Sequence, residues 1–315
     1  MTIKASGSSL AMSEIATEWG GTTAHSISEY YSNGAQVWSG AQDEAGNTIP
    51  SSGTISFSDF YSTPTISTGS GTATNFTSDG TYTIPFGAAT LQCYIHGGGG
   101  QGGEGDESGA GGGGGGGGSG CVVQGTLTIS NNSGSDYSSG DSQQTVTVTI
   151  GDGGNHASSG THASTSTAYA ESGEASTVVY GGQTTSAGGG GYGGGFSGNG
   201  TAYANASQGS NSIGSNFSIT TASSTGNAAD SYQGGSGDGF SSNGTAGKAL
   251  HANPLSLTST GGTAGSTSSN SAATGGNASG YGAGGGGAAS IDRTGAHHWS
   301  GGTGSAGYVR IQVAS

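Results

Sequence analysis

One stretch, residues 91–129, constrains the fold of this chain more than any other. Between His96 and Cys121, seventeen of twenty-four residues are glycine, so nothing there can build a core of side chains. The two flanks differ from this middle, because apolar and polar residues alternate over residues 91–95 and again over 123–129. Alternation with a period of two indicates β-strands. The stretch therefore predicts two strands joined by a long glycine-rich segment, which we call the glycine excursion.

A glycine run of this kind forms either a flexible linker or an extended helix of the polyproline II type, with three residues per turn. Helices of the second kind can pair their N–H and C=O groups with neighbouring helices, and only glycine lets the backbones approach so closely. The strand at each end favours the ordered helix, because a linker needs no such anchors. Further glycine runs lie at residues 188–195, 234–239, 282–287 and 301–307.

Other segments predict more strands. Residues 145–150 alternate strictly between Thr and an apolar residue, and Val309, Ile311 and Val313 alternate with polar neighbours. Residues 177–180 and 217–221 are weaker candidates. We predict a mostly β fold, in which an antiparallel, jelly-roll-like β framework carries a bundle of polyglycine II helices. Ordering a residue costs roughly 1–2 kcal/mol and a net hydrogen bond returns about 0.5–1.5 kcal/mol, so the glycine helices need the strands as anchors. Residues 69–315 are therefore expected to form one domain.

Residues 1–68 have a different composition, with no long glycine run. An apolar residue, a Ser, an acid and a second apolar residue recur in this order at residues 10–15, 26–30 and 55–60. A Ser followed by an acid suits the start of a helix, where the hydroxyl caps an N–H group and the carboxylate faces the positive end of the dipole. We predict three short helical turns that form a small N-terminal module. So small a unit buries little apolar surface alone, so it is expected to pack against a partner or against its own copies.

The charge balance excludes several partners. The net charge is −14 with only 4 Lys and Arg residues, whereas binding to a phosphate backbone or an anionic membrane requires clustered cations. No stretch is apolar enough to cross a membrane. We therefore expect neither nucleic-acid binding nor membrane insertion.

The sequence shows no catalytic machinery. The seven His residues are scattered, and no Cys or His spacing matches a zinc site. Residues 234–240 resemble one imperfect copy of a calcium-binding glycine repeat, and we interpret them as a glycine turn with a solvated Asp238. We expect no enzyme, no cofactor and no metal site.

Two cysteines, Cys93 and Cys121, flank the glycine excursion at the inner ends of the two strands. A disulfide between them is compatible with neighbouring strands. The alternative is a pair of buried thiols that act as small hydrophobic residues.

Aromatic residues are set singly among small residues in the second half of the chain. On loops, such rings offer a large rigid contact area, while Ser, Gly and Asn supply adaptable hydrogen bonds. The alternative is that some rings cap the glycine bundle. The residues that we predict to contact a receptor are Tyr192, Phe196, Tyr232, Phe240, Tyr281 and Trp299.

Two parts of the chain resemble known families. The order SSLAMSEIATEWGG, SISEYYSNGA and IPSSGTISFSDFY is similar to the N-terminal segment of many structural proteins of tailed phages, particularly marine phages, and implies an attachment module. The order FTSDGTYTIPFGAATLQCYIHGGGGQGG, GCVVQGTLTI, QTVTVTIGDGG and GGTGSAGYVRIQVAS resembles the glycine-rich domain of phage fibre and bacterial surface proteins. That second resemblance spans about residues 76–315 and implies an antiparallel β framework from which glycine helices project. Long Ser, Thr, Asn and Ala insertions in the middle of the chain depart from the pattern.

These resemblances imply a structural protein of a phage tail or fibre. We expect a distal adhesin that binds a host surface glycan or outer-membrane protein through loops between glycine helices, as in T-even-type fibre-tip adhesins. Residues 1–68 would attach it to other tail or fibre proteins, and a homo-oligomer is compatible with this role. The N-terminus has no apolar core of the length of a secretory signal, which fits a virion component that reaches the outside by lysis. The alternative is a structural or decoration subunit that makes no receptor contact.

Overall fold

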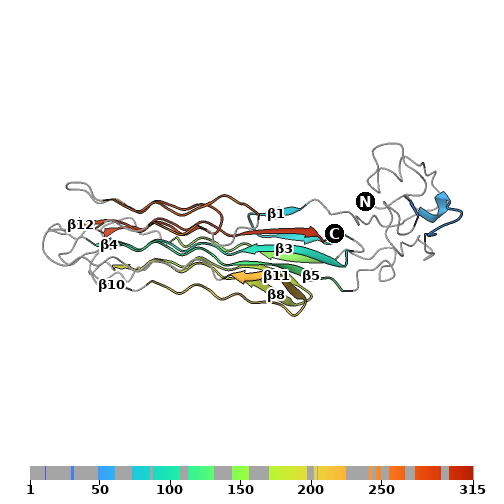
Figure 1. Ribbon diagram of the computed structural model, residues 1–315, viewed down its shortest axis with the longest axis horizontal. Helices are drawn as coiled ribbons and strands as arrows, with labels where there is room; N and C mark the ends of the chain where they lie inside the picture. The colour runs from blue at the N-terminus through green and yellow to red at the C-terminus, as the bar shows by residue number, and fades with distance from the viewer. Residues whose placement is uncertain are drawn as a thin grey trace.

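The computed structural model describes residues 11, 30–31, 49–60, 73–85, 88–106, 113–130, 144–155, 170–196, 202–203, 205–224, 241–242, 246–249, 255–266, 274–291 and 298–314. Over these residues the chain is mostly β, its sheets are antiparallel, and it has almost no helix, as the sequence predicts. Figure 1 shows an elongated molecule in which two short sheets lie at one end of a long bundle of extended segments. Within the described ranges, no helix is long and apolar enough to cross a membrane.

The first sheet has five strands and contains the flanks of the long glycine excursion. Every neighbouring pair in it is antiparallel, and β3 lies between β17 and β5. The strands, in spatial order, are β1 (Thr74–Phe76), β17 (Tyr308–Val313), β3 (Thr90–His96), β5 (Val122–Thr128) and β11 (Phe217–Ser224). The two strands predicted around the glycines are therefore direct neighbours, and the last predicted strand is paired with them.

The second sheet has four strands in the order in which they occur in the chain. These are β2 (Gly80–Thr83), β6 (Thr145–Thr149), β7 (Ser176–Tyr180) and β8 (Gln183–Ala187). Gly181 and Gly182 join β7 to β8 with φ values of +57° and +73°. Positive φ at both central residues is the requirement of the commonest two-residue hairpin turn, which glycine meets without strain.

The two sheets pack face to face on one apolar core. In β6, Val146 and Val148 point inward while the threonines beside them are exposed. Leu91, Cys93 and Ile95 of β3 belong to the same buried cluster. The antiparallel β framework is thus a sandwich of two sheets. Its jelly-roll-like connection stays a prediction.

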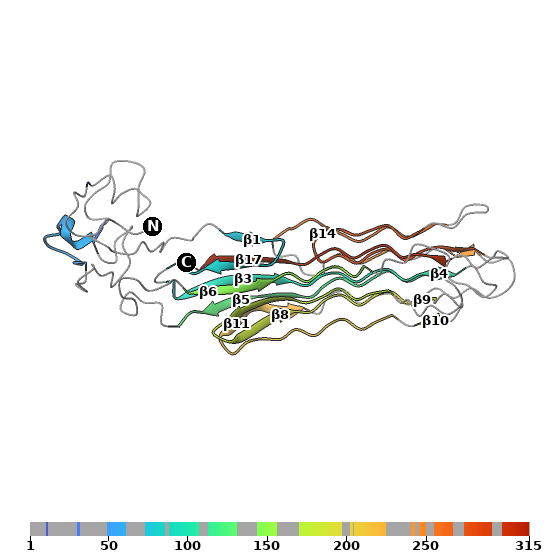
Figure 2. The same cartoon turned by 180° about the vertical axis from the view of Figure 1, so that it is seen from behind.

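Glycine-rich segments continue from the strands along the long axis of the molecule (Figures 1 and 2). Short strand pairs lie where they end. One pair is β4 (Gly105–Asp106) with β16 (His298–Trp299), another is β9 (Gly195–Phe196) with β10 (Ala202–Tyr203), and a third is β12 (Ser241–Ser242) with β15 (Ser290–Ile291). In Figure 1, β4, β10 and β12 lie together at the end remote from the sandwich, which we call the distal end. We call these three strand pairs the distal rim. A fourth pair joins β13 (Ser259–Thr260) to β14 (Ser279–Gly280).

The described part of the N-terminal module lies beyond the sandwich, at the opposite end from the distal rim (Figure 1). It contains one 3-10 turn, η2 (Phe57–Phe60), where the Asp59 carboxylate accepts a hydrogen bond of 2.7 Å from the Ser56 N–H group. This turn is the third of the three predicted ones. The other two lie outside the described residues, apart from Ala11 and Tyr30. The Tyr30 and Phe60 rings are buried and meet edge to face, 6.3 Å apart.

Candidate functional site

The segment that follows β3, residues 97–105, is the centre of the bundle. Every third amide in it binds the same neighbouring segment, residues 113–121, which runs in the opposite direction. The three bonds run from Gly97 N to Cys121 O (3.0 Å), from Gly100 N to Gly118 O (2.9 Å) and from Gly103 N to Gly115 O (2.7 Å). The partner moves back three residues whenever the donor moves forward three.

The amides between these positions bind other segments. Gly98 and Gln101 donate to the carbonyl groups of Glu174 and Glu171. The next amides in the chain donate to a third segment, from Gly99 N to Ser305 O (2.8 Å) and from Gly102 N to Gly302 O (2.9 Å). Three successive amides therefore point in three directions, and the pattern repeats every three residues.

The carbonyl groups of this segment accept hydrogen bonds from three more neighbours. The donors are Gly154, Gly190, Gly193, Gly285 and Ala288. Among the described residues, the central segment thus touches six others, which are residues 113–121, 151–154, 171–174, 188–194, 283–289 and 302–305. Backbone groups of neighbouring segments take the place of the side-chain core that the sequence cannot supply.

Close approach of the backbones explains why these positions are glycine. A Cβ atom on Gly98, Gly99 or Gly100 would lie 2.1, 1.9 or 2.1 Å from a backbone oxygen of a neighbour. These three residues face three different neighbours, so at these three positions the segment has no room for a side chain on any side.

Two residues of the central segment break the glycine pattern, and both are buried. Gln101 and Glu104 are 1% exposed, and the side-chain oxygen of Gln101 accepts a hydrogen bond of 3.1 Å from Glu171 N. They follow Gly98 at intervals of three, and Gly98 faces Asp152 of the segment that begins at Gly151. The sequence contains a signal for these polar residues in the glycine segment, because Gln101, Glu104 and Glu107 are spaced by three, the period of the hydrogen bonds. The sequence prediction did not use that spacing.

Two of the six predicted receptor-contact residues belong to the distal rim. Trp299 lies in β16, which pairs with β4, and its partly buried ring packs against the buried Ala289. Phe196 lies in β9, which pairs with β10. Tyr203, His298 and Ile291 also belong to rim strands. Several large residues therefore belong to the strands where the glycine segments end.

One comparison with known proteins identifies a family. A family model described as a glycine-rich domain matches residues 71–314. The chain belongs to this glycine-rich domain family. A search of curated proteins found no match.

The remaining predicted contact residues of the glycine-rich domain lie elsewhere. Tyr192 is half-buried within residues 188–194, and its carbonyl group accepts a hydrogen bond of 3.0 Å from Ala206 N. Tyr281 lies at the sandwich end of the bundle, where its ring is 4.9 Å from that of Tyr308. Tyr232 and Phe240 lie outside the described residues.

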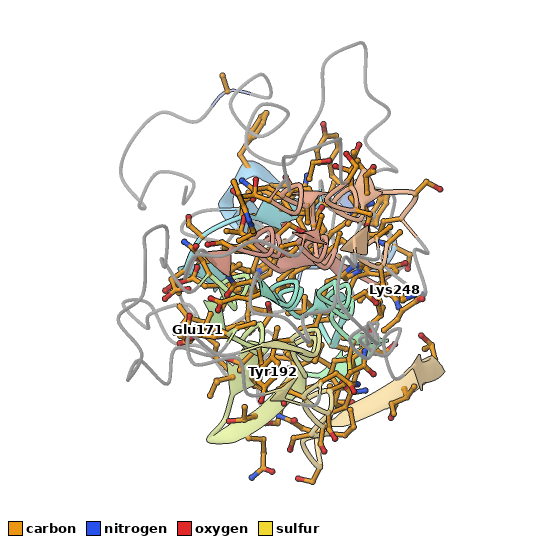
Figure 3. The ribbon with its side chains drawn as sticks, turned by 90° about the vertical axis from the view of Figure 1, so that its left-hand side faces the viewer. Glu171, Tyr192 and Lys248 are labelled. Carbon is orange, nitrogen blue, oxygen red and sulfur yellow. The ribbon has the colours of Figure 1, made fainter. Side chains whose placement is uncertain are left out.

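An acidic cleft of about 470 Å³ opens on the side of the glycine-rich domain. Asp152, Glu171 and Glu174 line it together with Asn155 and Thr303, and all three carboxylates belong to exposed residues. Seen from the distal end in Figure 3, Glu171 and Lys248 lie on opposite sides of the bundle. The described residues contain no group of His, Cys, Asp and Glu side chains that could hold a metal ion.

Cys93 and Cys121 are buried free thiols. In the pairing of β3 with β5, Cys93 lies opposite Gly125, four residues along the chain from Cys121. At about 3.3 Å per residue, that offset separates the two Cα atoms by at least ~13 Å, too far for a disulfide. Burial raises the pKa of the Cys93 thiol to about 12. The two cysteines therefore act as small buried residues, which is the alternative that the sequence left open.

Proposed function

We propose that this chain is a structural protein of a tailed-phage tail or fibre, and that its distal end binds a receptor on the host cell. One observation carries the proposal. The bundle is built from backbone, whereas aromatic residues such as Phe196 and Trp299 belong to the rim at its far end. The glycine segments themselves offer few side chains to recognise, so we place the specificity where larger residues interrupt the glycine.

We infer that the glycine segments are polyglycine II helices. The three-residue period of the hydrogen-bond partners supports this, because that helix has three residues per turn. Neighbouring helices would make the bundle a stiff spacer between the sandwich and the rim.

The proposed partners fit the positions of the two ends of the molecule. The described N-terminal residues lie at the end opposite the rim (Figure 1), which suits attachment to other tail or fibre proteins through residues 1–68. The receptor would be a surface glycan or an outer-membrane protein, and the site of action would be the virion outside the cell after lysis. We propose no catalytic role, and a homo-oligomer is compatible with this arrangement.

A second candidate function is a structural or decoration subunit without receptor binding. The contact of Tyr281 with Tyr308 favours it, because one of the six predicted contact rings packs against a buried tyrosine of the sandwich instead. The two functions differ in what the distal end touches.

An adsorption experiment separates them. The labelled full-length protein is incubated with a panel of bacteria, and binding is measured with and without competing unlabelled protein. An aromatic residue at the centre of an interface commonly contributes 2 kcal/mol or more, so Ala at a true contact should weaken binding about thirtyfold. Each of the six candidates is changed singly, with Trp299→Ala and Phe196→Ala expected to show the loss.

Thr147→Ala, on the exposed face of β6, is the control and should bind normally. If all six folded variants bind as well as the unchanged protein, the receptor contact is not where we propose. If the unchanged protein binds no bacterium of the panel, the structural subunit is favoured.

A further inference from the structure

His96 marks the boundary between the sandwich and the glycine bundle. It is the last residue of β3, and Gly97 begins the central glycine segment. In the sheet, His96 lies opposite Tyr308 on one side and opposite Val122 on the other. The three central strands of the five-stranded sheet thus pass into glycine segments at the same level.

The His96 side chain is enclosed at this boundary. It is 0% exposed, and neither ring nitrogen has a hydrogen-bond partner among the described residues. The Tyr308 ring meets it edge to face at 5.8 Å, and the Tyr281 ring contacts that of Tyr308 at 4.9 Å. We call His96, Tyr308 and Tyr281 the joint.

The groups around the joint do not favour a charged imidazole. Among the described residues, the titratable groups that ring contacts place here are Tyr308, which meets the imidazole, and Tyr281, which contacts Tyr308. The next residue on the same face of β17 is the cation Arg310, which lies 6.0 Å from the Tyr94 ring. Val122 and Ser176 are neutral. The Ser176 hydroxyl donates to the backbone oxygen of His96 at 2.7 Å, and it also accepts from Gly151 N at 3.0 Å. Burial lowers the pKa of His96 from 6.5 to about 4.

We propose that His96 makes the joint sensitive to acid. A protonated ring has no acceptor in its enclosed site, so protonation opens the joint and releases the glycine bundle from its rigid attachment to the sandwich. The device lies apart from the distal rim and does not depend on what the rim binds.

The direction and size of the acid effect on the joint follow from the difference between the pKa of His96 in the open joint and in the closed joint. When the joint is open, the imidazole takes up a proton near pH 6.5, whereas the closed joint resists protonation down to about pH 4. The closed joint is therefore fully favoured above pH 6.5 and loses stability as the pH falls. Between pH 7 and pH 5 the ratio of open to closed joint should rise about 20-fold. Ordinary carboxylates stay mostly ionised in that window, so their titration contributes little.

Amide hydrogen exchange of the full chain tests this proposal. We expect Gly97 and Gly307 to lose about 20-fold of their protection between pH 7 and pH 5, after correction for intrinsic exchange. His96→Phe keeps a ring in the site and should remove this loss, while His298→Phe, at the distal rim, should retain it. Equal protection at both pH values, or an unchanged loss in His96→Phe, overturns the proposal.

A second measurement needs no variant. Titration of the His96 ring by NMR in the unchanged protein should give a midpoint well below pH 6.5. A midpoint at pH 6.5 or above overturns the proposal even if His96→Phe fails to fold.

Discussion

At the scale of single residues, the bundle is governed by the absence of Cβ atoms. Gly100 illustrates this, because a Cβ there would lie 2.1 Å from the Gly191 carbonyl oxygen. That oxygen belongs to a backbone that is itself held by hydrogen bonds, so it cannot turn aside as a flexible side chain could. Gly209, in an outer segment, differs, since the nearest atom to its Cβ position is the Gly189 nitrogen at 3.0 Å.

We therefore expect Gly100→Ala to destabilise the fold by about 3 kcal/mol, the upper part of the range for overpacking. Gly209→Ala is the matched control, with an expected cost of about 1 kcal/mol. Urea unfolding of the three proteins measures both. A Gly100→Ala variant as stable as the Gly209→Ala variant would mean that the segments are not packed as closely as described.

At the scale of elements, alternation predicted the strands with clear apolar faces. The strand predicted at residues 145–150 corresponds to β6, and the strand predicted from Val309, Ile311 and Val313 corresponds to β17. The sequence reasoning missed β8 (Gln183–Ala187), because QTTSA has no apolar alternation. Its pairing with β7 depends on the turn at Gly181 and Gly182, so a Gly-Gly pair after a strand was the usable signal.

The side chain of Tyr180 forms hydrogen bonds at the ends of three strands, β5, β6 and β7. The Tyr180 hydroxyl, at the end of β7, donates to the Gln144 side-chain oxygen (2.5 Å) and accepts from Ser130 N (3.1 Å). Gln144 precedes β6 and Ser130 follows β5, so this hydroxyl bridges the two sheets at the sandwich end.

Tyr180→Phe should lower the free energy of unfolding by about 1.5 kcal/mol, because it removes these hydrogen bonds from a buried residue. Tyr94→Phe, on the partly exposed outer face of β3, is the control and should have little effect. Denaturant unfolding of both variants is the measurement. Equal stabilities would show that the bridge contributes nothing.

At the scale of the whole molecule, the candidate site was only partly predictable. The sequence places Phe196, Tyr281 and Trp299 next to glycine runs, but it does not say at which end of a run the chain turns back. In the structure the first and third belong to the distal rim, while Tyr281 contacts Tyr308 beside the sandwich. That distinction depends on the direction of each segment, which is fixed by strand pairing over long distances in the chain.

The same dependence links the stability of the bundle to that of the sandwich. Ordering a glycine costs more than a net hydrogen bond returns, so the segments stay ordered only while the strands hold their ends. The sandwich and the bundle should therefore open as one cooperative unit. Val148 lies in the core of the sandwich, remote from the distal rim, and is 1% exposed.

Val148→Ala should destabilise the core by about 2 kcal/mol. If the bundle depends on the sandwich, the amides of Gly100 and Gly285 should then exchange about thirtyfold faster. The amides of β3 should accelerate by the same factor. Thr147→Ala, its exposed neighbour in β6, should change neither set. If the amides of β3 accelerate in Val148→Ala while those of Gly100 and Gly285 keep their protection, the glycine segments are stable by themselves. The bundle would then be an independent unit with its own source of stability.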